Sequence, residues 1–196
     1  EHQYNSPWNI AANFNIDMSF SVQEIEGMLA EYESEHSTNM RTKEMAELLY
    51  DYTSGYPFLV SRMCKMIDEE LSSQTKYNGN AWKREGILEA VRNLLIEKNT
   101  LFDSLDAKIA NYPELKNILF KMLFSGETIS YYAGNAAIEM ALMFGFIAIR
   151  KAEIVVANKI FETRLYNQFL GEETVLSDYR SMASVDKNQF IREGKL

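Results

Sequence analysis

The spacing of apolar residues places the strongest constraint on what this chain can fold into. Between residues 21 and 125, apolar side chains recur every three or four positions, which puts them on one face of an α-helix. Short polar stretches rich in Ser, Asn, Gly or Pro interrupt this pattern and separate one helix from the next. The pattern predicts helices over residues 21–35, 42–53, 57–71, 83–98, 100–110 and 113–125. A mainly α fold follows.

Two local motifs sharpen the helix boundaries. Ser21 and Glu24 form the S-x-x-E pattern of a capping box, so the first helix is expected to begin there. The motif Ser54-Gly55-Tyr56-Pro57 predicts a tight elbow between two helices. In this elbow Gly55 is expected to be the left-handed cap, and Pro57 the first residue of the next helix.

The pattern changes after Gly126. It then predicts, in order, a short strand at 128–132, a buried helix at 135–144, a hairpin of strands 146–150 and 153–157, and a helix from Asn158 to Leu170. A helix, a short strand, a second helix and a hairpin in this order describe a winged helix. The expected fold class is therefore mainly α, with a helical bundle followed by a winged-helix domain that carries a small β-hairpin.

The chain is expected to divide into four regions. They are an N-terminal segment, a helical region, the winged helix, and a peripheral tail that is helical or extended, at residues 1–20, 21–110, 111–170 and 171–196.

The composition indicates a cytoplasmic setting. A single cysteine cannot form an internal disulfide, and two histidines cannot build a zinc site with it unless carboxylates join them. No run of roughly 18 apolar residues occurs, and the first residues lack the basic and apolar regions of a signal peptide. We expect a cytoplasmic protein without a membrane partner and without a metal site of its own.

The charge distribution argues against binding to nucleic acids. Residues 1–110 contain 18 acidic and 10 basic side chains, whereas residues 111–196 contain 10 of each. Neither part offers the excess of cations that releases counterions from a duplex. The second helix of the winged helix offers only Asn135 and Glu139 for reading bases, and Arg150 and Lys151 at the hairpin tip can each contact one phosphate. DNA is therefore an unfavoured partner, and a packing or interdomain role is favoured.

Three segments together resemble a bacterial protein family. They are Ser6-Pro7-Trp8-Asn9-Ile10-Ala11, the stretch Tyr52–Val60 around Gly55-Tyr56-Pro57, and the stretch Ala157–Asn167. They are similar to the AAA-like ATPases of anaerobic gut and rumen bacteria, which are related to the signal-transduction (STAND) NTPases that carry a Gly-x-Pro motif. The resemblance covers almost the whole chain.

The resemblance implies a place within a larger protein. In that family a P-loop ATPase core, which uses ATP and magnesium, precedes a helical lid and a winged helix, and a nuclease-like domain of the PD-(D/E)xK type commonly follows. This chain resembles only the lid, at 21–110, and the winged helix. Its start without methionine and its end at Leu196 lead us to expect a fragment of a longer chain. Its partners would then be the ATPase core and the nuclease-like domain of the same polypeptide.

The resemblance also implies residues that lie near the nucleotide. Gly55, Tyr56 and Pro57 match the Gly-x-Pro motif, whose backbone lies beside the nucleotide in related NTPases and couples it to the lid. Arg62, one turn into the following helix, would act as a lid arginine that reaches a phosphate. The alternatives are a simple helix elbow for the motif and an ordinary surface charge for Arg62.

No catalytic constellation is predicted in the chain itself. It has no G-x-x-x-x-G-K-[ST] loop and no apolar strand that ends in acidic residues able to hold magnesium. Cys64 lies on the apolar side of its helix, and the acidic run Asp68-Glu69-Glu70 is typical of a solvated helix face. Glu193 and Lys195 match part of a nuclease signature, but a match this short arises readily by chance. Catalytic residues, metal ligands and a bound cofactor are therefore not expected here.

Three functions from different classes remain open. The first is a non-catalytic lid and winged helix that couples the nucleotide state of an ATPase to movement between domains. The second is a free-standing winged-helix adaptor that binds protein or DNA, and the third is an unrecognised hydrolase. A P-loop encoded shortly upstream would separate the first from the others.

Overall fold

The computed structural model describes residues 19–172, and within them the chain is mainly helical with one small antiparallel sheet. The first elements are four helices, α1 (Val22–His36), α2 (Thr42–Thr53), α3 (Pro57–Lys65) and α4 (Arg84–Ile96). We call these four helices the helical part. Residues 1–18 and 173–196 lie outside the described residues, and with them most of the predicted N-terminal segment (1–20) and peripheral tail (171–196), including Glu193 and Lys195.

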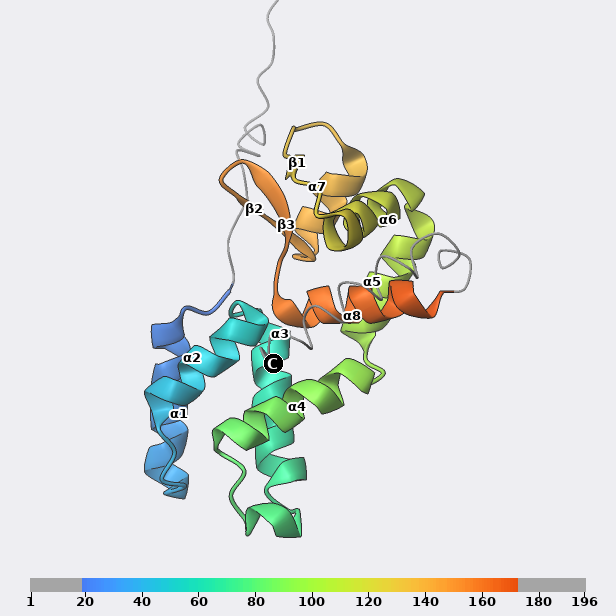
Figure 1. Ribbon diagram of the computed structural model, residues 1–196. Helices are drawn as coiled ribbons and strands as arrows, with labels where there is room; N and C mark the ends of the chain where they lie inside the picture. Colours follow the sequence, from blue (N-terminus) through green and yellow to red (C-terminus); the bar gives the residue numbers. More distant parts are fainter. Residues whose placement is uncertain (1–18, 173–196) are drawn as a thin grey trace, which may run out of the picture.

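The remaining elements follow in the order that the pattern predicts. The helices are α5 (Thr100–Asn111), α6 (Pro113–Phe120), α7 (Ala136–Met143) and α8 (Lys159–Gly171). The strands are β1 (Ile129–Ser130), β2 (Ile147–Arg150) and β3 (Glu153–Val156). We call α6, α7 and the three strands the sheet part. Figure 1 shows the helical part and the sheet part as separate groups, with α8 running between them.

Two of the predicted capping signals, both at helix N-termini, are confirmed. Ser21 and Glu24 form the complete capping box, in which the Ser21 N–H donates to the Glu24 carboxylate at 2.7 Å and the Glu24 N–H donates back to Ser21 Oγ at 3.2 Å. Asn158 caps α8 by accepting from the Phe161 N–H at 2.9 Å. Each cap satisfies backbone donors that have no partner inside the helix.

Two predicted helices have the expected ends but change helix type before reaching them. The helix that begins at Pro57 continues to Leu71, but its last segment, Met66–Leu71, is π-helical. The helix that begins at Pro113 likewise continues into a π-helical segment, Lys121–Ser125. A short 3₁₀-helix, Thr75–Tyr77, lies in the connection to α4. The apolar spacing marks the inward face of a helix but does not distinguish hydrogen bonds to the fourth residue from those to the fifth.

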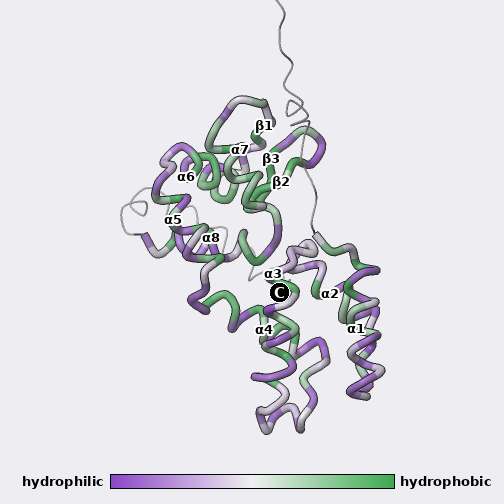
Figure 2. The backbone as a smooth tube through the Cα atoms, turned by 180° about the vertical axis from the view of Figure 1, so that it is seen from behind, coloured by the Kyte–Doolittle hydropathy of each residue, from purple (hydrophilic) through white to green (hydrophobic). Residues whose placement is uncertain are grey.

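The sheet has the strand order β1-β3-β2 and is antiparallel throughout. In the hairpin, Ile147 lies opposite Val156 and Arg150 lies opposite Glu153, while Ile129 of β1 pairs with Ile154 of β3. Figure 2 shows the hairpin arms and α7 as hydrophobic segments and the hairpin tip as hydrophilic. Within the described residues, β2 is therefore paired on one side only.

One predicted burial is wrong. The helix at 135–144 was expected to be buried, yet α7 buries only Ala137, Ile138 and Ala141, and Met143 is 75% exposed. A helix composed almost entirely of small and apolar residues carries no polar stripe to indicate which face meets the core.

The helical part and the sheet part share one hydrophobic core. The buried apolar side chains of both parts form a single cluster, which includes Leu49 of α2, Leu94 of α4, Phe146 beside β2 and Phe161 of α8. Helix α8 packs against both α2 and α4 as well as β3. The two parts therefore meet along α8 and along the elbow that joins α2 to α3.

Candidate functional site

The elbow between α2 and α3 requires a glycine at position 55, because the backbone of Phe20 packs directly against it. Ser54, not Gly55, is the left-handed C-cap of α2, with φ 47°, and Gly55 follows with φ 74°. The Phe20 N–H donates to the Gly55 carbonyl at 2.8 Å. A Cβ on Gly55 would lie 1.9 Å from the Phe20 carbonyl oxygen. Both the positive φ and the close approach of the Phe20 backbone exclude a side chain here.

Thr53 completes the elbow and was missed in the sequence. It is fully buried, its Oγ1 donates to the Leu49 carbonyl at 2.7 Å, and the same oxygen accepts from the Gly55 N–H at 3.1 Å. A buried hydroxyl with both bonds made costs little to bury and holds the turn in one geometry. A threonine directly before Ser-Gly at a helix end is the signal that could have pointed to it.

Tyr56, the middle residue of the motif, connects the elbow to the sheet part. Its hydroxyl donates to the Phe144 carbonyl at 3.3 Å. Its ring packs edge-on against the Phe161 ring, with 5.3 Å between the two ring centroids. A Cβ on Gly145 would lie 2.9 Å from the Tyr56 ring. Burial raises the pKa of the Tyr56 hydroxyl, which therefore stays protonated as a donor at neutral pH. One aromatic side chain thus joins α3, the α7–β2 turn and α8.

A groove of about 740 Å³ lies between this elbow and the α7–β2 segment. We call it the elbow groove. Of the residues predicted to lie near nucleotide or phosphate, Tyr56, Pro57 and Arg150 line it together. Gly55, Arg62 and Lys151 do not line it. Four large apolar side chains that line it are also among the exposed ones of the molecule: Tyr50, Phe58, Met143 and Ile149.

The polar groups of the elbow groove favour a negatively charged or polar ligand. Helices α3 and α8 both begin at its wall, with Pro57 at the start of α3 and Asn158 at the cap of α8. Helix N-termini carry a partial positive charge, and Arg150 adds a full one. Asn158 is 4% exposed, and its Nδ2 has no hydrogen-bond partner within the described chain.

The described lining of the groove contains no carboxylate, imidazole or thiol. Among the residues of 19–172 that line it, no Asp, Glu, His or Cys occurs. In the part of the chain that the structure describes, no group of three or more such side chains is placed to hold a metal ion.

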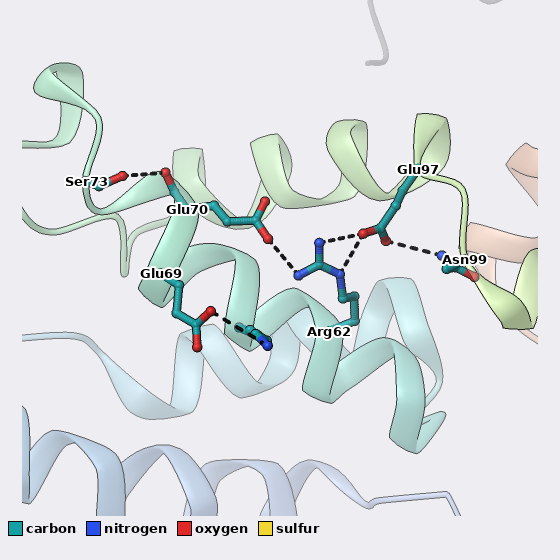
Figure 3. Close-up of polar contacts among 7 residues, drawn as sticks. Arg62, Glu69, Glu70, Ser73, Glu97 and Asn99 are labelled. Atoms are coloured by element: carbon teal, nitrogen blue, oxygen red, sulfur yellow. Dashed lines mark hydrogen bonds and ion pairs between the residues drawn. The ribbon is translucent and has the colours of Figure 1, made fainter.

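Arg62 does not line the groove and forms ion pairs with two carboxylates, those of Glu70 and Glu97 (Figure 3). Its Nε donates to Glu97 at 2.8 Å and its Nη1 donates to Glu70 at 2.7 Å, and its side chain is 22% exposed. Burial tends to raise the pKa of Glu97, but the hydrogen bonds from Arg62 and Asn99 outweigh it and lower that pKa overall. In this arrangement Arg62 ties α3 to the end of α4.

The remaining candidates have structural partners. Desolvation raises the pKa of the Cys64 thiol to about 12, so the nucleophilic thiolate is scarce at neutral pH. Asp68 accepts a hydrogen bond from the Tyr32 hydroxyl, and Glu70 pairs with Arg62. At the hairpin tip Lys151 is exposed, and both turn residues, Lys151 and Ala152, have positive φ values of 51° and 64°.

No protein-family model matches the chain, and neither a curated protein nor a solved structure is significantly similar to it. Among the helices of residues 19–172, none combines the length and the hydropathy needed to cross a membrane.

Proposed function

We propose that this chain is the non-catalytic lid and winged-helix region of a larger AAA/STAND-like ATPase, in which it couples the nucleotide state to movement between domains. The observation that carries the proposal is the pair of contacts that Tyr56 makes with the sheet part and with α8. Tyr56 belongs to the Gly-Tyr-Pro motif, and it makes a hydrogen bond to Phe144 and an aromatic contact with Phe161. A ligand that moved the motif would therefore move the sheet part with it, because the contact is direct.

The order of elements supports the winged-helix part of the proposal. Helix α6, strand β1, helix α7 and the β2–β3 hairpin follow one another, and β1 pairs with β3 rather than with β2. The outer strand of the hairpin carries Arg150 into the elbow groove. In the proposed parent protein the wing would then face the same ligand as the Gly-Tyr-Pro motif.

The chemistry of the elbow groove supports a binding role rather than a catalytic one. Two helix N-termini and Arg150 favour a phosphate, whereas the lining offers no carboxylate for magnesium. ATP and magnesium would thus be held chiefly by the P-loop core of the parent protein. Arg62 would contribute to phosphate binding only after its ion pairs with Glu70 and Glu97 break. We therefore propose the Gly-Tyr-Pro motif, rather than Arg62, as the main element near the nucleotide.

A second candidate is an adaptor that binds another protein through the sheet part. The exposed apolar side chains favour it, since Met143 is 75% exposed and Tyr132 is 66% exposed. Helix α7 favours protein over DNA, because its Glu139 accepts from the Gly134 N–H and its other side chains are apolar.

The coding sequence upstream of this chain tests the proposal. The proposal requires a P-loop within the preceding couple of hundred residues of the same polypeptide. If the reading frame begins at this chain or carries no such loop, the lid role is excluded and the adaptor takes its place.

A further inference from the structure

The outer edge of β2 runs along the elbow groove. Every residue of β2, from Ile147 to Arg150, lines the groove. Neighbouring residues of a strand point to opposite faces, so a groove that contacts all of them follows the edge of the strand rather than one face. Within residues 19–172, β2 pairs with β3 alone, and no strand lies beside this edge of the sheet (Figure 1).

The hydrogen bonds of the hairpin show which backbone groups point to this edge. The Ala157 N–H donates to the Phe146 carbonyl at 3.0 Å, so Phe146 and every second residue after it bond towards β3. Ile149 lies between two such residues, and its N–H and C=O therefore point away from β3. Ile149 is 37% exposed. An extended peptide can pair with such a residue by adding a strand to the sheet.

Apolar side chains line the groove around this edge. Tyr50 and Phe58 of the helical part are each 37% exposed, and Met143 of α7 is 75% exposed. Exposed apolar side chains that gather in one groove are typical of a site that binds another molecule. A peptide with apolar side chains would remove this surface from water.

The charge of the groove favours an acidic partner. Arg150 is the one charged side chain among the described residues that line the groove, although the whole chain carries a net charge of −8. The N-termini of α3 and α8 add partial positive charge. A second copy of the chain fits less well, because its own β2 would bring another Arg150 and no carboxylate to the edge.

We propose that the elbow groove binds an extended, acidic and apolar peptide of another protein, which adds a strand to β2 and places a carboxylate at Arg150. Docking of this peptide does not depend on the proposed ATPase. In the proposed parent protein a phosphate would use the same groove, so nucleotide and peptide would compete. The test below uses this chain alone, and its failure would leave the search for an upstream P-loop unaffected.

Fluorescence anisotropy with three labelled synthetic peptides tests the docking. The acidic probe has the sequence TVEVEVT, and in the neutral and basic probes Gln or Lys replaces both Glu residues. At low ionic strength we expect the full 196-residue chain to bind the acidic probe at least about threefold more tightly than the neutral probe. The basic probe should bind more weakly than either.

Arg150→Gln should remove this preference, so that the acidic and neutral probes bind equally. Because Arg150 is exposed, the melting temperature should change little. Lys151→Gln is the matched control, since it removes the same charge from the neighbouring residue, which does not line the groove. It should keep the preference for the acidic probe.

Amide hydrogen exchange of the full chain checks the pairing with β2. A saturating concentration of the acidic probe should slow exchange of the Ile149 amide at least about tenfold. The proposal is overturned if the acidic and basic probes bind equally, if Lys151→Gln removes the preference as fully as Arg150→Gln, or if the Ile149 amide is not slowed.

Strong protection of the Ile149 amide before any peptide is added would also overturn the proposal. Protection that is independent of protein concentration would mean that the chain itself covers the edge. Protection that rises with protein concentration would mean that a second copy does.

Discussion

At the scale of single residues, two glycines lie so close to neighbouring atoms that a side chain has no room there. Gly55 lies against the backbone of Phe20, and Gly145 lies against the Tyr56 ring. Gly79 provides a comparison, because it has a similar φ of 81° but nothing lies within 4 Å of its added Cβ. The two costs of replacing a glycine, backbone strain and a steric clash, can therefore be separated in this molecule.

Gly55→Ala should destabilise the protein far more than Gly79→Ala. At Gly79 only the positive φ is penalised, at about 1 kcal/mol. At Gly55 the new Cβ must also displace the Phe20 carbonyl, so we expect a loss of about 3 kcal/mol or more. Urea unfolding of both variants measures the difference. Equal losses at the two positions would mean that Phe20 does not hold the elbow.

Glu97→Gln should weaken the tie between α3 and α4 by roughly 1–2 kcal/mol at pH 7, because it removes the charge that Arg62 pairs with. The pKa of Glu97 is lowered in the folded protein, so its stabilising effect is complete above the ordinary value of 4.5 and is lost as the pH falls through the folded pKa. The two proteins should therefore converge in stability as the pH falls below the folded pKa of Glu97.

The control for this pair is Glu69→Gln. Glu69 forms an ion pair with Lys65 (Figure 3), in which the Glu69 carboxylate lies 3.8 Å from the Lys65 Nζ and both side chains are 60% exposed. Its loss should therefore change the unfolding free energy by less than about 0.5 kcal/mol. Denaturant unfolding between pH 3 and pH 7 provides both comparisons. A difference between wild type and Glu97→Gln that grows on acidification would contradict the assignment.

At the scale of helices and strands, local signals predicted boundaries well and long-range contacts poorly. The caps at Ser21 and at Asn158 could be predicted because an N-cap side chain bonds to the backbone only three residues further on. The pairing of Ile129 with Ile154, and that of Arg62 with Glu97, join residues far apart in the chain, and spacing alone does not reveal such partners. Met143 was wrongly expected to be buried because its helix, in which Glu139 is the one polar residue, has no polar stripe that marks the exposed face.

The hairpin turn offers a test at this scale. Lys151 and Ala152 both adopt positive φ, which is unfavourable for residues with a Cβ and is the geometry that Asn-Gly prefers. Replacing the pair by Asn-Gly should therefore raise the unfolding free energy by about 1 kcal/mol. The melting temperature of the double variant measures this gain. An unchanged or lower melting temperature would show that the two residues are not strained in the turn.

At the scale of the whole molecule, the helical part and the sheet part act as one unit because α8 and Tyr56 touch both. Helix α8 packs against α2, α4 and β3, and Tyr56 reaches Phe144 and Phe161. Three of the residues predicted near nucleotide or phosphate, Tyr56, Pro57 and Arg150, line one groove between the parts. The sequence indicated Tyr56 and Pro57 separately from Arg150, and only the fold places all three in the lining of one groove.

The most direct test of the proposed coupling is Pro57→Ala in the longer protein that carries this chain with its P-loop core. Position N1 of a helix accepts alanine, so the melting temperature of the 196-residue chain should change little. Nucleotide affinity or ATP turnover of the longer protein should change several-fold, because the motif is proposed to lie beside the nucleotide. Wild-type affinity and turnover in Pro57→Ala would contradict the account and leave Gly55-Tyr56-Pro57 as a structural elbow.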